Sequence, residues 1–476
     1  MPKLANSGNI NSLTTLRLID KIHSRQLSCY EVMHAFLDII GTHNKTYNAL
    51  VNCIPAQESL KQAKLLDQNP NLFKGGLLRG IPQAPKDLFP LKGFKTTMGS
   101  VVFENKQTNQ DAVIFSRIRR QGAIFIGRSN SPEFGLGCHT YNSVFGTTHN
   151  AIRPELSAGG SSGGAAVAVA LGMLPVADGT DMMGSLRTPA AFNGIYGFRP
   201  TPGLIPSGAQ NKMVKPPLSV AGPIARNVPD LALMFAIMAD FPQSLPFKPL
   251  PTESNFVDPL KADLKNKRIA WMGTLNEHLQ IEPGISDQCI QALEVLKQSG
   301  CVIEEHVPEF DYHSLWSSWT TLRSFLFYKA YFEVLGHREN FSLIKPEAQW
   351  EFKRGANISN TQLKSALQIH SKWVCTLNKT FKNFNYLALP ATQVYPFAAS
   401  QHWPKHIGVT PMDTYHRWME IVVPASMAGL PTICLPVGNT NLGKGTGLQI
   451  MGPSNSDLAV LQLGYTYNQK TGDYKQ

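Results

Sequence analysis

Two serines and one lysine of this chain could act together chemically. Ser161 lies in a stretch that reads Gly-Gly-Ser-Ser-Gly-Gly over residues 159–164, and Ser185 follows it by 24 positions. Lys86 lies upstream of both, within residues 80–90. Two hydroxyls and one amine are the groups that a serine hydrolase needs when lysine, rather than histidine, removes the proton. The three motifs therefore suggest a hydrolase that cleaves amide bonds.

Lys86 could serve as the base only if it loses its proton. An unperturbed lysine has a pKa of about 10.4 and is charged at neutral pH. Apolar residues flank Lys86 at 81–82 and 88–90, and burial among such residues lowers a lysine pKa by several units. A neutral amine could then take a proton from a serine, directly or through a second hydroxyl. A solvated surface lysine is the alternative, and we expect the adjacent Asp87 to be a structural partner.

Ser185 is predicted to lie at a turn between a strand and a helix. Residues 173–180 have the pattern of a strand, and residues 185–192 that of the start of a helix. Unpaired backbone N–H groups at such a turn can form an oxyanion hole, in which one donor contributes about 3–4 kcal/mol. The predicted donors are the amides of Met182, Met183, Gly184 and Ser185. A serine that only caps the helix is the alternative.

The glycine-rich stretch by itself permits two other interpretations. It precedes an apolar run at residues 165–171, and a loop at a helix N-terminus can bind anions through free N–H groups. A nucleotide-binding protein is therefore the non-enzyme alternative, although the stretch matches neither G-x-x-x-x-G-K-[ST] nor G-x-G-x-x-G. The other interpretation is a structural turn without chemistry.

The alternation of helices and strands predicts an α/β fold. Residues 12–22 have helical spacing with Ser12 as the expected cap, and Ser28 with Glu31 forms a capping box before a second helix. Residues 111–121 predict an amphipathic helix. The segments predicted as strands are 123–127, 173–180, 268–273, 386–390, 432–436 and 447–452.

We expect one domain of 476 residues with four parts. The parts are N-terminal helices (1–75), a catalytic core (76–240), a peripheral, mostly helical region that shapes the pocket (241–385), and returning core strands with a C-terminal helix (386–476).

Composition excludes several classes of protein. Hydrophobic residues make up 43% and charged residues 16%, which is typical of a globular protein and not of a disordered one. No run approaches the ~18 apolar residues of a membrane span, and the first eight residues lack the apolar core of a secretory signal. The seven cysteines are scattered, so neither disulfides nor a zinc site is indicated. We expect a cytoplasmic protein.

The net charge of +11 could attract nucleic acid or a membrane surface. However, no block of five basic residues occurs, and residues 117–120 are the densest run. We therefore expect a solvated basic surface, with nucleic acid an unfavoured partner and no membrane partner.

The motifs resemble those of the amidase signature family, whose enzymes use a Ser–cis-Ser–Lys triad. After its lysine that family has a Gly-x-x-Thr-Thr-x-Gly-Ser stretch, which this chain has at residues 93–100. The likeness spans nearly the whole chain apart from residues 240–380. Its other segments are 111–113, 127–135, 221–226, 428–431 and 447–449.

The resemblance implies a role for each motif residue. Lys86 would be the base, Ser185 the nucleophile, and Ser161 the bridging serine with a cis peptide bond. It also implies a central, mostly buried mixed β-sheet covered by helices on both faces, and neither a cofactor nor a metal. The residues expected to support the site are Gly160, Ser162, Asp181 and Arg187.

Met183 departs from the family pattern, because most members have glycine there. The sequence is similar to a branch with Asp-Met-Met-Gly-Ser at this loop, so we do not interpret the change as inactivating. A thioether at this position could narrow or line the acyl pocket.

Histidine offers a competing mechanism. Ser185 does not occupy a G-x-S-x-G nucleophile elbow. His139 could line the pocket, but a hydrogen-bonded structural histidine is the more common case. His402 and His406 are a poor pair of metal ligands, because Pro404 between them disfavours the helix that would align the two rings.

The predicted activity is hydrolysis of a small-molecule amide through an acyl-serine, by a chain that could form a homodimer. The alternative is the glutamine-hydrolysing subunit of a tRNA-dependent amidotransferase. Met183 and the weak match over residues 300–400 argue against that alternative, although the positive charge is compatible with it.

Overall fold

The computed structural model describes residues 10–206, 218–240 and 257–472. The N-terminal residues considered above for a secretory signal therefore lie outside the described part. The central sheet has eight strands in the order β11-β10-β12-β16-β15-β8-β9-β7. Its strands are β7 (Val176–Asp181), β8 (Tyr196–Arg199), β9 (Val220–Ala225), β10 (Arg268–Trp271), β11 (Val302–Glu305), β12 (Tyr386–Pro390), β15 (Thr432–Asn439) and β16 (Lys444–Met451).

The sheet is mixed, as predicted. Strand β10 pairs in parallel with β11 and β12, whereas the pairs from β12 through β16, β15, β8 and β9 to β7 are antiparallel. Each segment predicted as a strand overlaps an observed strand, and β7, β15 and β16 extend beyond the predicted bounds. The remaining strands form two-stranded pairs: β1 (Leu50–Val51) with β4 (Arg128–Ser129), β2 (Pro82–Gln83) with β3 (Ile124–Phe125), β5 (Tyr141–Asn142) with β6 (Gly146–Thr147), and β13 (His406–Ile407) with β14 (Thr410–Pro411).

Several strands of the sheet, including β7 at one edge, are buried on both faces. Every residue of β7, β9 and β12 is buried, as expected for strands covered on both sides. Strand β7 nevertheless carries Asp178, Thr180 and Asp181. Buried polar groups need hydrogen-bond partners, so the partners of these three side chains show where the site lies.

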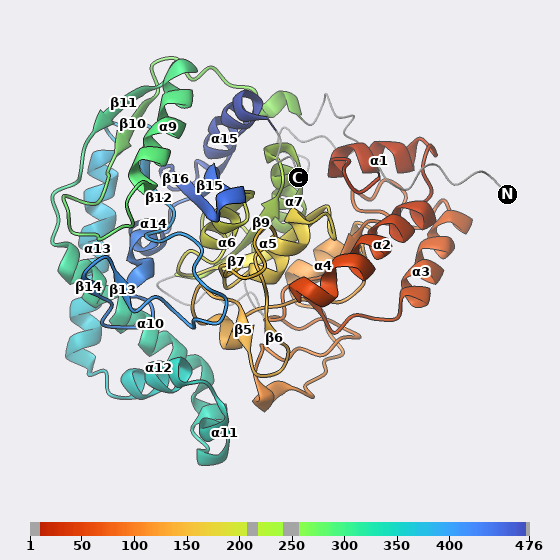
Figure 1. Cartoon of the computed structure of the whole chain (residues 1–476), viewed down its shortest axis with the longest axis horizontal. Helices are drawn as coiled ribbons and strands as arrows, with labels where there is room; N and C mark the ends of the chain where they lie inside the picture. Colours follow the sequence, from red (N-terminus) through yellow and green to blue (C-terminus); the bar gives the residue numbers. More distant parts are fainter. Residues whose placement is uncertain (1–9, 207–217, 241–256, 473–476) are drawn as a thin grey trace.

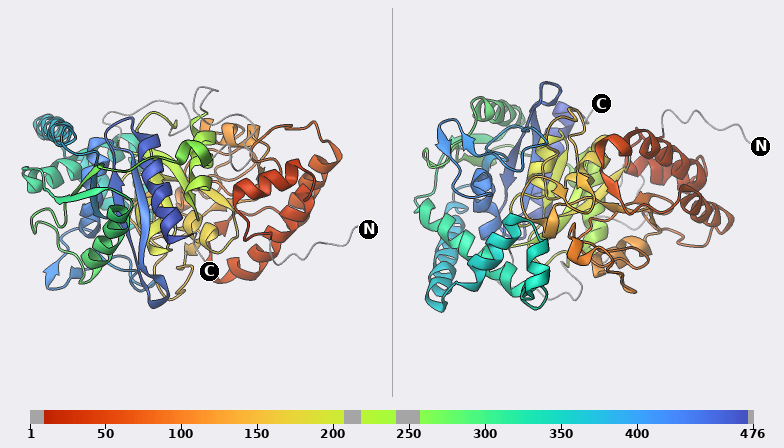
Figure 2. Two further views of the ribbon diagram at one scale, coloured as in Figure 1. Left: turned by 90° about the horizontal axis from the view of Figure 1, so that it is seen from above. Right: turned by 60° about the horizontal axis from the view of Figure 1, so that its bottom comes forward.

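Helices cover the sheet, and Figure 2 shows it between two groups of helices. Helices α5 and α7 both contact β9, and α6, α9 and α15 contact β15. Their bounds are α4 (Val113–Arg120), α5 (Gly163–Ala170), α6 (Arg187–Phe192), α7 (Val228–Ala239), α9 (Ile285–Gln298), α14 (Val423–Ala428) and α15 (Asp457–Thr471).

The first three helices lie on the side of the N-terminus (Figure 1). They are α1 (Thr15–His23), α2 (Cys29–Tyr47) and α3 (Ala56–Gln68). The capping box of Ser28 and Glu31 is confirmed. The cap predicted for the first helix is wrong: Thr14, not Ser12, accepts a hydrogen bond from Arg17 N and starts α1. Both residues carry a hydroxyl group that can cap a helix, and the spacing of apolar residues could not show which of them precedes the first helical turn.

The helical layer comprises α10 to α13 and lies on the opposite side of the sheet from α1–α3 (Figure 1). Its helices are α10 (Tyr312–Leu335), α11 (Arg338–Leu343), α12 (Pro346–Ala356) and α13 (Asn360–Thr380). A second hydrophobic cluster joins this layer to the sheet through buried Trp319 and Trp373, and it includes Met183 of the loop after β7. In the described ranges, no helix combines the length and apolar character that crossing a membrane requires.

Candidate active site

Lys86 lies at the centre of a buried cluster of hydroxyl groups. Its Nζ atom is 2.7 Å from Ser161 Oγ, 2.9 Å from Ser162 Oγ and 2.9 Å from Thr180 Oγ1. The Lys86 side chain is 1% exposed. The surface alternative considered for this lysine is therefore excluded, and three hydroxyls surround one amine.

The hydrogen-bond capacity of these groups limits what Lys86 can do. A neutral amine has two N–H donors and one lone pair, so with three hydroxyl partners one hydroxyl must donate to the nitrogen. Ser162 Oγ donates to the carbonyl of Thr180 at 3.3 Å and accepts from Thr180 N at 3.2 Å. Ser161 and Thr180 therefore remain as donors to Lys86, and Ser161 is the nearer. In the neutral state the lone pair can receive the Ser161 proton.

Burial allows Lys86 to be partly deprotonated near physiological pH. Desolvation lowers the pKa of Lys86 to about 7, against the opposing effects of Asp178, Cys138 and Asp181. Asp178 is also buried, and desolvation raises its pKa to about 6 despite the hydrogen bond from Lys86 N. Both shifts have the same cause, because burial disfavours each charged form.

The backbone around Lys86 is held by two charged side chains. Its amide donates to Asp178 Oδ2 at 3.3 Å, and Arg128 Nη2 donates to its carbonyl at 2.8 Å. Asp87 accepts from the amide and the hydroxyl of Thr97 and lies 3.5 Å from Arg128. Asp87 thus makes the structural contacts expected of it and holds the segment that carries the lysine.

Ser161 reaches Lys86 from the loop before α5. The Gly160–Ser161 peptide bond is cis, as the resemblance implies. Gly160 lies close to the neighbouring segment: a Cβ atom there would lie 3.0 Å from Thr140 Oγ1 and 3.1 Å from the Cys138 carbonyl carbon. Contacts this short are tighter than most Cβ contacts, so a side chain at this position would have to push residues 138–140 away by a few tenths of an ångström.

Ser185 lies between the end of β7 and the start of α6, in the predicted strand-to-helix turn. The loop is joined to the other serine motif because Ser162 N donates to Ser185 O at 3.3 Å. In the part of the chain that the structure describes, Ser185 Oγ forms no hydrogen bond with Ser161, and no histidine donates to or accepts from it. Catalytic hydrogen bonds are often long in a free enzyme and shorten with substrate.

The amides of the loop differ in availability. Gly184, with φ +79°, donates its N–H to Asp181 Oδ1 at 3.0 Å. This predicted oxyanion donor is therefore committed to holding the loop in the present structure. Within the described ranges, we find no acceptor for the amides of Met183 and Ser185.

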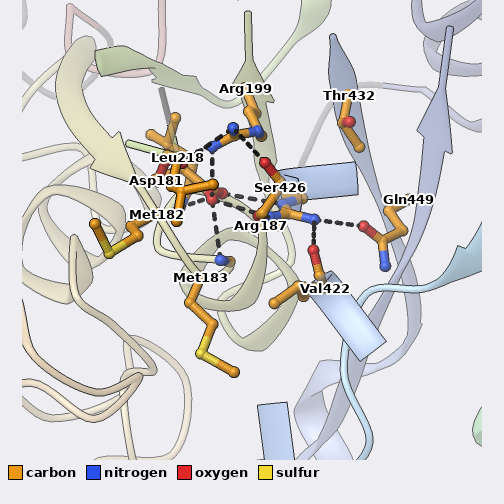
Figure 3. A network of polar contacts seen from close by, with 12 residues as sticks. Asp181, Met182, Met183, Arg187, Arg199, Leu218, Val422, Ser426, Thr432 and Gln449 are labelled. Carbon is orange, nitrogen blue, oxygen red and sulfur yellow. Dashed lines mark hydrogen bonds and ion pairs between the residues drawn. The ribbon is translucent and has the colours of Figure 1, made fainter. Parts of the chain in front are cut away.

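Asp181 anchors the loop through a buried ionic network (Figure 3). Its carboxylate receives Arg187 Nε at 3.0 Å and Nη2 at 2.9 Å, and it lies 3.4 Å from Arg199 Nη1. Burial alone would raise the Asp181 pKa, but the two guanidiniums and the loop amides hold it well below its usual range. Arg187 extends the network to Ser426 Oγ at 2.7 Å and Gln449 Oε1 at 2.7 Å. The loop is thereby tied to β16 and α14.

The sequence profile described as Amidase matches residues 31–461. The chain belongs to the amidase family. An acylamidase from Rhodococcus erythropolis is 30% identical over 96% of this chain and 95% of its own length. One subunit of the glutamyl-tRNA(Gln) amidotransferase from Halothermothrix orenii is 28% identical over 96% of this chain and 97% of its own length. A solved bacterial aryl acylamidase of the amidase signature family has the same fold, with a TM-score of 0.85, 24% identity and 96% coverage of both chains.

This amidase is an enzyme that hydrolyses amides. The protein interior accommodates the side chain of Met183, the residue that departs from the family pattern. Met183 is 3% exposed and belongs to the second hydrophobic cluster with Phe192 and Trp418. Figure 3 shows its side chain directed away from the Asp181 carboxylate. Met183 has no positive φ, so the backbone there accepts a side chain. Cys138 Sγ contacts the Met183 carbonyl at 3.1 Å.

A small cavity of the amidase is lined by Cys138, whose thiol contacts the Met183 carbonyl of this loop. Its volume is about 10 Å³, close to the space that one water molecule needs. Its lining is drawn from the segment next to the cis peptide, from the helical layer and from the loop before α14. The lining residues are 136–139, Tyr141, Lys345, Glu347, 402–403, Tyr415 and Trp418.

Two histidines of the amidase that the sequence singled out, His139 and His402, have structural partners. His139 lines the cavity, and its ring nitrogens bind Ser157 Oγ at 2.7 Å and the Ala399 carbonyl at 3.0 Å. Burial lowers the His139 pKa to about 4. His402 stacks on Tyr141 with ring centroids 4.4 Å apart. Among the described residues, no group of three His, Cys, Asp or Glu side chains could hold a metal ion.

Several site residues were not recognised in the amidase sequence. Thr180 lies beside Asp181 in the nucleophile motif. A polar residue within a predicted strand, here the fully buried β7, could have indicated its role. Asp178 precedes it by two positions and therefore points to the same face of β7. Gln449 lies in a segment that carries the family resemblance, but nothing in the sequence pointed to its contact with the loop. Arg199 and Ser426 carried no signal, because only the folded sheet brings them to the loop.

Proposed function

We propose that this amidase cleaves a small-molecule amide without a metal, through an acyl-enzyme on Ser185. Ser161 relays protons and Lys86 is the base. The observation that carries the proposal is the buried 2.7 Å contact between Lys86 Nζ and Ser161 Oγ. An amine whose pKa lies at about 7 can accept a proton at neutral pH, which an exposed lysine cannot.

In the proposed acylation, Ser185 Oγ attacks the amide carbonyl and forms a C–O bond. Its proton passes to Ser161 Oγ while the Ser161 proton passes to Lys86 Nζ. The relay then returns a proton to the departing nitrogen, so the C–N bond breaks and a neutral amine leaves. Water repeats the sequence on the ester and releases the carboxylic acid.

The amides of Met182, Met183 and Ser185 would stabilise the oxyanion. Each donor of this kind contributes about 3–4 kcal/mol when it is aimed at the developing charge. Gly184, whose amide binds Asp181, would contribute by shaping the loop. Asp181 and Arg187 would keep these amides in place without touching the substrate.

A small acyl amide is the substrate class that we favour. The support is the 30% identity to a protein named acylamidase over nearly the full length of both chains. The catalytic groups contact only the carbonyl, so they do not select the amine. We propose that residues of the helical layer make that selection, and that the chain could function as a homodimer.

Glutamine hydrolysis within an amidotransferase is the second candidate. The support is the relative that is named as part of a glutamyl-tRNA(Gln) amidotransferase, with 28% identity over 96% of this chain. Release of ammonia from glutamine only after partner subunits are added would favour this candidate. Hydrolysis of simple amides by the isolated chain would favour the first.

The first experiment is intact-mass measurement after treatment with a fluorophosphonate. In this reaction Ser185 Oγ would form a bond to phosphorus and fluoride would leave. We expect one adduct on the wild type, mapped to Ser185 by peptide sequencing, no adduct on Ser185→Ala and strongly slowed labelling of Lys86→Ala. A folded wild type that stays unlabelled, and that ATP or phosphate protects in a thermal-shift assay, would contradict the proposal and favour a nucleotide-binding protein.

A further inference from the structure

The helical layer contacts the nucleophile loop through one buried cation. Arg323 of α10 is 3% exposed, and its Nη1 atom lies 3.4 Å from Met182 Sδ. Met182 is the first residue after β7 and precedes the candidate oxyanion amides. The arginine comes from the part of the chain in which the sequence carried no motif, so its contact with the loop is a tertiary feature.

The guanidinium of Arg323 is fixed on its other sides. Its Nε donates to Glu351 Oε1 at 2.7 Å, and its Nη2 donates to Tyr415 Oη at 2.8 Å. Tyr415 in turn donates to Glu351 Oε1 at 2.7 Å, and Ser324 donates to Glu351 Oε2 at 2.5 Å. The guanidinium group is planar, and hydrogen bonds at Nε and Nη2 prevent it from rotating freely. Its remaining nitrogen, Nη1, is therefore held in a fixed position against Met182.

The charge of Arg323 also acts on Cys138, which contacts the residue after Met182. Cys138 contacts the Met183 carbonyl at 3.1 Å. Burial raises the pKa of the Cys138 thiol to about 12, and Arg323 is one of the cations that oppose this shift. The guanidinium is therefore close enough to Cys138, which contacts the loop at Met183, to act on that thiol electrostatically.

We propose that Arg323 is a positioning residue for the reaction. Held by Glu351 and Tyr415, it fixes Met182 and thereby aims the oxyanion amides of the nucleophile loop. The inference rests on the proposed function, because it concerns formation of the bond to Ser185. It gives the helical layer a part in catalysis: movement of α10 or α12 against the sheet would change the rate of acylation.

The physical basis is the sensitivity of catalysis to alignment. A displacement of about 1 Å at a catalytic group can slow a reaction about 10²-fold. Methionine is unbranched and adapts its shape, so Met182 would not hold the start of the loop by rigidity. A fixed donor against its sulfur supplies the restraint that the side chain lacks.

The test compares acylation rates of the whole chain with a fluorophosphonate. We expect Arg323→Met to react about 10²-fold more slowly than the wild type, and Arg323→Lys to recover part of that loss. On a small amide that the wild type hydrolyses, kcat should fall while KM stays nearly constant. The matched control is Arg117→Met on α4, which removes a partly buried arginine whose Nη1 donates to the Met238 carbonyl at 2.6 Å, away from the Arg323 network, and should react at the wild-type rate.

A second variant decides the question if Arg323→Met does not fold. Met182→Leu conserves volume and is expected to be stable, yet it removes the sulfur that Arg323 contacts. We expect it to acylate several-fold more slowly at an unchanged melting temperature, and the double variant with Arg323→Met to be no slower than Arg323→Met alone. Wild-type rates in both single variants would overturn this inference and leave the proposed function intact. An unlabelled wild type would overturn the proposed function, and this inference with it.

Discussion

Lys86 Nζ lies 2.7 Å from Ser161 Oγ, and both side chains are at most 2% exposed. This pair joins the two motifs that are 75 residues apart in the sequence. An amine at this depth loses hydration of its charged form, and its neutral form needs a hydroxyl proton to complete its hydrogen bonds. The proposed transfer of the Ser161 proton to Lys86 requires a contact of this kind.

The rate of acylation should depend on pH through Lys86. The amine acts as a base only when it is deprotonated, and its pKa is lowered to about 7. Below that pH the fluorophosphonate labelling rate should fall about tenfold per pH unit, and above it the rate should level off. The groups that influence this limb are Asp178, Cys138 and Asp181. A rate that is constant from pH 6 to pH 9, or that falls as the pH rises, would contradict Lys86 as the base.

Thr180→Val should slow acylation about tenfold or more, because the isosteric change removes one of the three hydroxyl partners of a buried amine. Thr180→Ser retains the hydroxyl and is the matched control, with a rate near that of the wild type. The measurements are the labelling rate at a pH where the rate has levelled off and the melting temperature. Equal rates for the valine and serine variants would show that Thr180 has only a packing role.

Asp181→Asn should lower the free energy of unfolding by about 3–5 kcal/mol, because it leaves the guanidiniums of Arg187 and Arg199 buried without a compensating charge. Urea unfolding followed by fluorescence measures this loss. Asp38→Asn is the control: Asp38 is exposed and its carboxylate pairs with His34 on the same helix α2, so its loss should cost at most about 1 kcal/mol. Similar losses for the two variants would mean that the network in Figure 3 does not stabilise the fold.

Gly160→Ala should impair both folding and labelling, because its Cβ would lie 3.0 Å from Thr140 Oγ1 and 3.1 Å from backbone atoms of residues 138–139. Gly41→Ala is the matched control. Gly41 lies within α2 and has no neighbour within 4 Å of an added Cβ, so alanine should stabilise the chain by about 0.5–1 kcal/mol. Thermal unfolding of both variants checks the pair, and a Gly160→Ala protein as stable and as reactive as the wild type would contradict the close approach described here.

Local patterns determined much of the fold and the positions of the key groups. The apolar run at Tyr386–Pro390 predicted β12 with its observed bounds, and Ser28 with Glu31 identified the start of α2. The apolar neighbours of Lys86 indicated its burial. These features depend on residues adjacent in the chain, and backbone periodicity and capping act over that range.

Long-range contacts decided the rest. Arg187 meets Ser426 and Gln449, which are 239 and 262 residues away, only because α14 and β16 pack against the loop after β7. Sequence spacing could not reveal that Gly184 gives its amide to Asp181, since this depends on loop geometry, nor that Arg323 reaches Met182 across the second hydrophobic cluster. The sequence by itself thus determined which groups could react, whereas the order of strands in the sheet and the docking of the helical layer decided which groups meet. Those contacts form between surfaces that exist only once the chain has folded.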